Sequence, residues 1–326
     1  MNISYQFYHE ATLPDLQRLW VEATDWGEQT LNNLHERFMA APFGPPRIVV
    51  AVDADTDEMI GQFRFMPSRV SVNGREVRAV RPFGTIVSPK MREAITSSNP
   101  LEQPAVAMYL HAIKELKAMG EQLIYMVPDP RWVRLFKMIP FLHCGSFPLW
   151  SLPVPMPATL PLGEGYSASK LQSWDERVDH LWEKTAQFHG CAVVRTARTL
   201  AWKTALAKFD LTVVERGSEL VGLAASVRRG DRQWLICDML FADTGDSLRA
   251  TLAAACNAAH EHATTSEDDN PIHKAAVLVT PNMESAAVAL GFKRDAYDFP
   301  IVVHVLDDTI NLEEVSPAKW YVSAND

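Results

Sequence analysis

Residues 81–120 read RPFGTIVSPKMREAITSSNPLEQPAVAMYLHAIKELKAMG, and the rest of the 326-residue chain is organised around them. The short apolar run Thr85-Ile86-Val87 stops at Ser88-Pro89, and a basic, irregular segment follows. A helical pattern comes next, with apolar residues at Val106, Leu110, Ile113 and Leu116. Unpartnered backbone N–H groups at a helix N-terminus point outward and favour anions. The stretch therefore predicts a strand that ends beside an anion-binding helix N-terminus.

The composition is that of an ordinary globular protein, with 47% hydrophobic and 22% charged residues. No apolar run approaches the roughly 20 residues of a membrane span. The opening residues, MNISYQFYHEA, lack the basic and apolar regions of a signal peptide. The cysteines are widely scattered and form no close pair, which is typical of a reducing compartment. We therefore expect a cytoplasmic protein without a membrane span.

The charge distribution argues against nucleic acid as a partner. The net charge is -9, and most of the excess acid lies in the second half of the chain, which would repel a phosphate backbone. The first half carries a local run of basic residues between Arg64 and Arg92. Two interpretations of this run remain open: a solvated strand face, or a basic lip for a phosphorylated ligand.

The order of predicted elements occurs twice. In the first half, patterns of strands and helices occur at 4–9, 11–23, 28–39, 47–52 and 59–66. Asn73-Gly74 then predicts a hairpin turn into a strand that ends at Val87. The central helix, a strand at 122–127, a short helix at 131–139 and a closing hairpin at 141–152 complete this half. Proline and glycine then dominate residues 153–165, which predicts a linker. A similar order follows it and ends in closing strands at 291–306. This repeated order predicts an internal duplication, with domains at 1–152 and 166–326.

Several short segments carry a resemblance to one superfamily. They are Phe7–Asp15, Ile48–Val52 with Met59-Ile60-Gly61, Val87–Arg92 and Leu135–Phe141, and in the second half Leu220-Val221-Gly222 and Ala289–Phe292. They resemble successive motifs of the GCN5-related N-acetyltransferase (GNAT) superfamily, in tandem. The resemblance implies an α/β (α+β) fold of two GNAT-like domains, each a mixed, mostly antiparallel sheet flanked by helices.

The same resemblance implies transfer of an acyl group from acetyl-CoA or another acyl-CoA to an amine of a small molecule or a peptide. It places the acyl-CoA in the first half, between the fourth and fifth strands. The expected contacts are the backbone amides of Ile86, Val87 and Ser88 and the charge of Arg92. Trp26 lies where members of the superfamily line the acceptor site. The second half would be structural or would complete the acceptor pocket.

The chain departs from the superfamily pattern at two places. The pyrophosphate loop normally reads Gln/Arg-x-x-Gly-x-Gly/Ala; Arg92 can occupy the first position, but residues 93–100 contain no glycine. The tyrosine that often protonates the departing thiolate corresponds to Phe136 in the first half and Ala287 in the second, and neither donates a proton. Two alternatives therefore stay open: a catalytically inactive binding protein, and a transferase with an acyl carrier protein or aminoacyl-tRNA as donor.

Other chemical candidates are few. Asp238 lies in an apolar strand, where burial would raise its pKa and suit it to act as a base; the alternative is a carboxylate paired with an arginine or facing solvent. Glu76 and Tyr109 are further candidates. Apart from Trp26, the tryptophans, Trp132 among them, are expected in core or inter-domain packing. No HExxH motif or Cys/His quartet is present, so no metal is expected.

Overall fold

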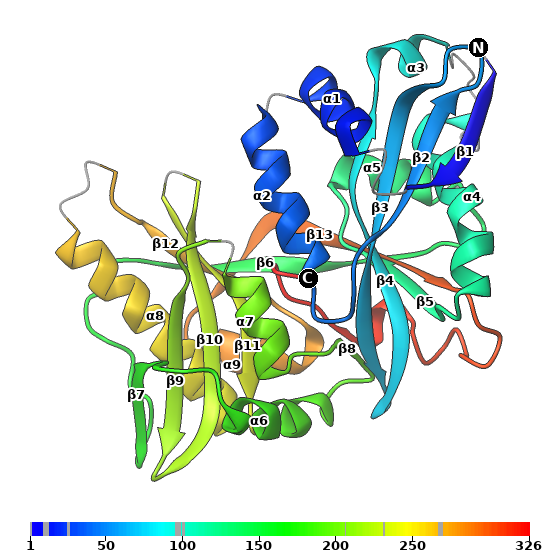
Figure 1. Ribbon diagram of the computed structural model, residues 1–326. Coiled ribbons are helices and arrows are strands. Elements are labelled where there is room, and N and C mark those ends of the chain that lie inside the picture. The colour runs from blue at the N-terminus through cyan, green and yellow to red at the C-terminus, as the bar shows by residue number, and fades with distance from the viewer. Residues whose placement is uncertain are drawn as a thin grey trace.

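The computed structural model describes residues 2–8, 13–24, 27–94, 99, 102–205, 207–230, 232–266 and 270–326. These residues form one 14-stranded mixed sheet that runs through both halves of the chain, with helices on its faces (Figure 1). Most neighbouring strands are antiparallel, and three pairs are parallel: β4 with β5, β11 with β12, and β8 with β14. The mixed, mostly antiparallel α/β architecture expected from the sequence is confirmed.

The first half supplies six strands and five helices of the described residues. The strands are β1 (Ile3–Phe7), β2 (Arg47–Asp53), β3 (Glu58–Val72), β4 (Arg75–Val87), β5 (Leu123–Met126) and β6 (His143–Pro153); the helices are α1 (Leu13–Ala23), α2 (Gly27–Met39), α3 (Pro89–Ala94), α4 (Pro104–Ala118) and α5 (Pro130–Phe136). Asn73 and Gly74 join β3 to β4 with φ angles of 48° and 80°. Two left-handed residues in a two-residue loop match the twist of the flanking strands, so the predicted hairpin is confirmed.

Helices cover both faces of the first-half sheet (Figure 1). The apolar stripe of α1, with Leu16, Leu19 and Trp20, is buried against Ile48 and Met59 of the sheet. On the opposite face, the buried side chains of α4 pack against a different set of strand residues; this cluster includes Val106, Ala112, Leu116, Phe63, Phe65 and Val80. Each helix presents apolar residues three and four positions apart, which explains why one face of each is buried.

The second half supplies eight strands and four α-helices of the described residues. Its strands are β7 (Tyr166–Lys170), β8 (Cys191–Val193), β9 (Asp210–Arg216), β10 (Glu219–Arg229), β11 (Gln233–Phe241), β12 (Lys274–Leu278), β13 (Lys293–Val305) and β14 (Trp320–Tyr321); its helices are α6 (Glu176–Ala186), α7 (Ala197–Thr204), α8 (Asp246–Thr265) and α9 (Glu284–Ala289). A large apolar cluster forms around α8 and the strands beneath it.

The two halves exchange their closing strands. Twelve strands follow the order β1-β2-β3-β4-β5-β13-β6-β12-β11-β10-β9-β7, and β8 joins the sheet at β3 and pairs with β14. The strand β13 of the second half therefore lies beside β5 of the first. Val303 pairs with Tyr125, and Val277 of β12 pairs with Trp150 of β6. Figure 1 shows β6 and β13 crossing between the two lobes.

This exchange corrects part of the sequence interpretation. The predicted hairpin at 141–152 is wrong, because those residues supply the single strand β6, whose partners come from the second half. Residues 153–165 do connect the halves, yet the hydrogen-bonded sheet passes between the units predicted at 1–152 and 166–326. An alternating apolar pattern predicts which face of a strand is buried, but it does not predict which other strand pairs with that strand.

Among the described residues, no helix has both the length and the apolar character needed to cross a membrane. The same residues contain no cluster of three or more His, Cys, Asp or Glu side chains that could hold a metal ion.

Candidate functional site

The site begins where β4 and β5 stop pairing. These parallel strands pair at Ala79 with Leu123 and at Val80 with Ile124. Beyond that point β4 continues to Val87, whereas β5 ends at Met126. A cavity of about 240 Å³ lies between the two strand ends, α4 and α5. We call it the apolar cavity.

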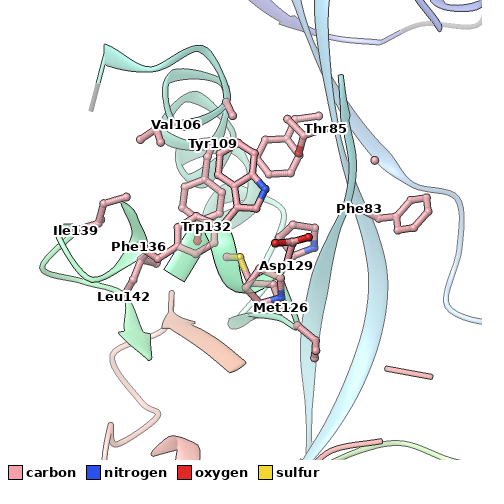
Figure 2. Close-up of a pocket in the computed structure, with 16 residues that line it drawn as sticks. Phe83, Thr85, Val106, Tyr109, Met126, Asp129, Trp132, Phe136, Ile139 and Leu142 are labelled. Atoms are coloured by element: carbon pink, nitrogen blue, oxygen red, sulfur yellow. The ribbon is translucent and has the colours of Figure 1, made fainter. Parts of the chain in front are cut away.

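Aromatic and aliphatic side chains dominate the wall of the apolar cavity. They include Phe63, Val106, Tyr109, Met126, Phe136, Ile139 and Leu142, with Thr85 and Asp129 as polar groups. Figure 2 shows Tyr109 of α4 and Trp132 and Phe136 of α5 on one side of β4, with Phe83 on the other side of that strand. Trp132 stacks on Phe136, with 6.2 Å between ring centroids and 20° between planes. Such a wall favours an apolar ligand group.

A second cavity, of about 380 Å³, adjoins the first. Its lining includes Ala23 and Thr24 at the end of α1, Arg92 of α3, and Gln103 and Pro104 at the start of α4. We call it the Arg92 cavity. The two cavities share three lining residues, which are Thr85, Ala105 and Trp132. Trp132 is 42% exposed, so the expectation that it serves core packing is wrong, and its side chain borders both cavities.

The resemblance predicts that the backbone amides of Ile86, Val87 and Ser88 bind the acyl-CoA. The strand geometry shows which of these N–H groups faces the splay. The Ser88 N–H donates to the Ile60 carbonyl at 2.9 Å, and Ile86 lies opposite Gln62 in the same ladder. Ladder hydrogen bonds alternate along an antiparallel pair, so the amides of Ile86 and Ser88 face β3 and that of Val87 faces away from it. Of the three, only Val87 therefore presents its N–H to the splay.

Two more features make the Arg92 cavity attractive to an anion. Arg92 is exposed, and its Nε donates to the Val87 carbonyl at 3.1 Å, which holds the guanidinium at the cavity. Helix α4 starts at Pro104, and its first intrahelical amide bond runs from Ala107 to Gln103. The amides of Ala105 and Val106 precede that bond and add the positive end of the helix dipole. Residues 95–98 and 100–101 of the predicted loop lie outside the described residues.

Polar groups at the apolar cavity have fixed protonation states near neutral pH. The hydrogen bonds from Arg131 lower the pKa of Asp129 to about 2, so Asp129 is a weakly basic carboxylate. Burial raises the pKa of Tyr109 well above its usual value. Burial also lowers the pKa of His304, its partner on β13, to about 4. The pair is therefore a neutral phenol bonded to a neutral imidazole.

The other predicted residues lie elsewhere. Trp26 is outside the described residues. Asp238 is 1% exposed, and Arg195 Nε donates to its Oδ1 at 2.6 Å, with Lys203 Nζ 3.6 Å from Oδ2. This is the arginine-paired alternative, as a carboxylate removed from water requires. Asp238 lines neither of the two cavities.

The remaining candidates separate in the same way. Phe136, which the resemblance aligns with a proton-donating tyrosine of the superfamily, lines the apolar cavity. Ala287 is buried in the core of the second half. Glu76 is exposed and forms an ion pair with Arg69. Sequence reasoning missed Trp132 as a site residue, because only the placement of α5 against the splay brings it to both cavities.

Comparison with known proteins identifies the fold. No protein-family model and no curated protein sequence matches the chain. A GCN5-related N-acetyltransferase from Anabaena variabilis ATCC 29413 matches with a TM-score of 0.68 and 11% identity, over 94% of this chain and 73% of that one. A GCN5-related N-acetyltransferase from Kribbella flavida matches with a TM-score of 0.65 and 13% identity, over 94% of this chain and 71% of that one. Saccharomyces cerevisiae N-myristoyltransferase, solved with bound myristoyl-CoA, matches with a TM-score of 0.55 and 9% identity, over 93% of this chain and 79% of that one. The chain therefore has the fold of the GCN5-related N-acetyltransferases, as its sequence motifs suggested.

Proposed function

We propose that the protein is an N-acyltransferase that transfers an acyl group from an acyl-CoA to an amine of a small molecule or a peptide. The observation that carries the proposal is the pair of adjoining cavities at the β4–β5 splay, one apolar and one bordered by Arg92 and the start of α4. An acyl-CoA combines an apolar acyl group with a phosphorylated carrier. The two cavities match these two chemistries side by side.

Each part of the donor has a candidate partner. The pyrophosphate would lie in the Arg92 cavity, near the guanidinium and the first amides of α4. The Val87 N–H would donate a hydrogen bond to the acyl-CoA where the two cavities adjoin. The acyl group would enter the apolar cavity past Thr85, which borders both.

The size and lining of the apolar cavity favour an acyl group longer than acetyl. A cavity needs only about 10–15 Å³ of such space to hold a water molecule, so 240 Å³ far exceeds the needs of two carbons. Its far wall is apolar, with Phe136, Ile139 and Leu142. Each buried CH₂ group contributes about 0.8 kcal/mol, or roughly a fourfold gain in affinity.

The reaction itself forms a C–N bond and breaks a C–S bond. The amine must be neutral to attack, and its proton would pass to water because Asp129 is too weak a base. A backbone N–H at the splay would stabilise the oxyanion that forms on the carbonyl. The departing thiolate would take its proton from water, since Phe136 replaces a donor and the Tyr109 hydroxyl is bonded to His304.

Two measurements test the proposal. The first is the thermal stability of the protein with CoA, acetyl-CoA and a series of longer acyl-CoAs, because a ligand that binds only the folded state raises the melting temperature. The second is release of free CoA thiol in the presence of a panel of amines. We expect a shift that grows with chain length, and thiol release with at least one amine. Binding without thiol release would indicate an inactive binding protein. An unchanged melting temperature at millimolar concentrations of every acyl-CoA would refute acyl-CoA as the acyl donor.

A further inference from the structure

Arg64 is a fully buried arginine that forms no ion pair with the residues that the structure describes. It lies on β3 and is 0% exposed. None of its guanidinium nitrogens, Nε, Nη1 or Nη2, hydrogen bonds to the residues that the structure describes. The side chain lies instead between two aromatic rings, 5.4 Å from the ring centroid of Trp20 and 5.9 Å from that of Phe38. Burial lowers its pKa to about 10, which still leaves it a cation at neutral pH.

The chain treats its other fully buried arginine differently. Arg195 donates hydrogen bonds to Asp238 and to Asp326, two buried carboxylates. Cation–π contacts recover part of the cost of removing a guanidinium from water, but they satisfy none of its N–H groups. Arg64 therefore has the properties of an anion-binding side chain whose anion is a separate molecule.

A second buried polar group lies on the same face of the same strand. Gln62 is 0% exposed, and its Nε2 donates to the Gly84 carbonyl at 3.0 Å. Its Oε1 has no hydrogen-bond partner among the described residues. Residues two apart on a strand share a face, so Gln62 and Arg64 point to the same side of β3. The intervening Phe63 lies in the opposite cluster with α4.

This polar pair lies next to the proposed acyl site. Arg64 is opposite Phe83 in the β3–β4 ladder, and Gln62 is opposite Ile86. Phe83 and Gly84 line the apolar cavity, and Thr85 borders both cavities. Figure 2 shows Phe83 on the far side of β4 from Tyr109. The Oε1 atom of Gln62 thus lies on the strand next to the splay, and the guanidinium of Arg64 lies two residues further along that strand.

We propose that Gln62 and Arg64 form the acceptor subsite, and that the acceptor is an amine that also carries a carboxylate, such as an amino acid. This inference rests on the acyltransferase function proposed above. The Gln62 Oε1 atom would accept an N–H of the amine, and the Arg64 fork would bind the carboxylate with two parallel hydrogen bonds. Trp20 and Phe38 cover the guanidinium, so the acceptor enters when α1 and α2 move away from the sheet.

The chemistry of the surroundings favours a carboxylate over a phosphate. One guanidinium neutralises one carboxylate, and its planar fork matches the two oxygens. A phosphate brings nearly two charges and three strong acceptor oxygens. The flanking rings of Trp20 and Phe38 provide no further charge to match them.

The test measures acceptor binding without any acyl-CoA. Calorimetric titrations compare glycine, L-leucine and L-glutamate with glycinamide, L-leucinamide and the diamide of glutamate, at constant ionic strength. For at least one amino acid, we expect the wild-type protein to bind at least tenfold more tightly than the matching amide. Arg64→Met should remove this preference, and Arg64→Lys, which keeps the charge and loses the fork, should reduce it. Arg69→Met, on the same strand, is the matched control and should leave it unchanged.

Folding of the variants is checked separately. Arg64→Met replaces an unmatched buried cation by an apolar side chain of similar length, so its melting temperature should equal or exceed that of the wild type. Equal binding of amino acids and amides, no binding of either, or a preference that survives in both Arg64 variants overturns the subsite. If acyl-CoA still binds in that case, the proposed function stands without it. Amino-acid binding with no response to any acyl-CoA would overturn the function and leave an anion site.

Discussion

The hydroxyl of Tyr109 and Nδ1 of His304 lie 2.9 Å apart, although 195 residues separate them in sequence. Tyr109 is on α4 and lines the apolar cavity, whereas His304 is on β13, the strand that the second half inserts beside β5. The hydrogen bond therefore attaches the wall of the proposed acyl site to the exchanged strand. Through it, the second half supports the site of the first.

The first prediction concerns the pH dependence of stability. Burial lowers the pKa of His304 to about 4, so between pH 6.5 and 4 the unfolded chain binds a proton that the folded chain does not. Stability from this group is fully present above pH 6.5 and is lost as the pH falls. Between pH 7.5 and 5 the loss should be about 2 kcal/mol. His304→Gln should show a pH dependence weaker by that amount in urea unfolding; an unchanged dependence would contradict the assignment.

The second prediction places the donor in the first half. Arg92→Ala removes the cation at the Arg92 cavity, and a hydrogen bond to a charged group contributes about 1.5–3 kcal/mol, so CoA binding should weaken roughly tenfold or more. Asp246→Ala is the control, because Asp246 is an exposed residue at the start of α8 that pairs with Arg249. Calorimetry gives both affinities. If the two variants bind CoA alike, the donor does not lie in the first half.

The third prediction concerns the acyl chain. Val106→Phe adds a ring to the wall of the apolar cavity, so longer acyl-CoAs should lose affinity while CoA and acetyl-CoA keep theirs. Blocking two CH₂ groups should cost about 1.6 kcal/mol, which is roughly 15-fold in affinity. Ile113→Phe, on the same helix and outside the lining, controls for the strain of a larger side chain. A parallel loss for every ligand would show that the variant damages the fold and not the acyl site.

The fourth prediction separates structure from catalysis at Asp238. Asp238→Ala removes the acid that Arg195 Nε contacts, and breaking a buried ion pair costs about 3–5 kcal/mol of stability. Asp238 lines neither cavity, so the folded variant should release CoA thiol with the pH profile of the wild type. Chemical unfolding and assays below the melting transition measure the two effects. A changed pH profile would restore Asp238 as a base.

Much of the local structure was predictable because its causes are local. Asn73-Gly74 specified a hairpin, and the apolar spacing within the helix predicted at 11–23 specified one buried helix face. The run that ends at Val87 and the helix that follows it located the splay, where Val87 and Arg92 now border a cavity. Turn propensity, helix periodicity and helix capping act over a few residues, so they can be read from the order of residues alone.

The sequence by itself determined most of the order of elements, the superfamily resemblance and the region where the two cavities lie. Only the tertiary structure decided that β6 and β13 change partners, that Trp132 borders both cavities, and that Arg64 is buried without an ion pair among the described residues. Strand pairing and burial depend on contacts between residues far apart in the chain, and a strand pattern is the same whichever neighbour it meets. A charged residue inside an apolar strand therefore becomes informative only when the structure reveals whether an opposite charge lies beside it.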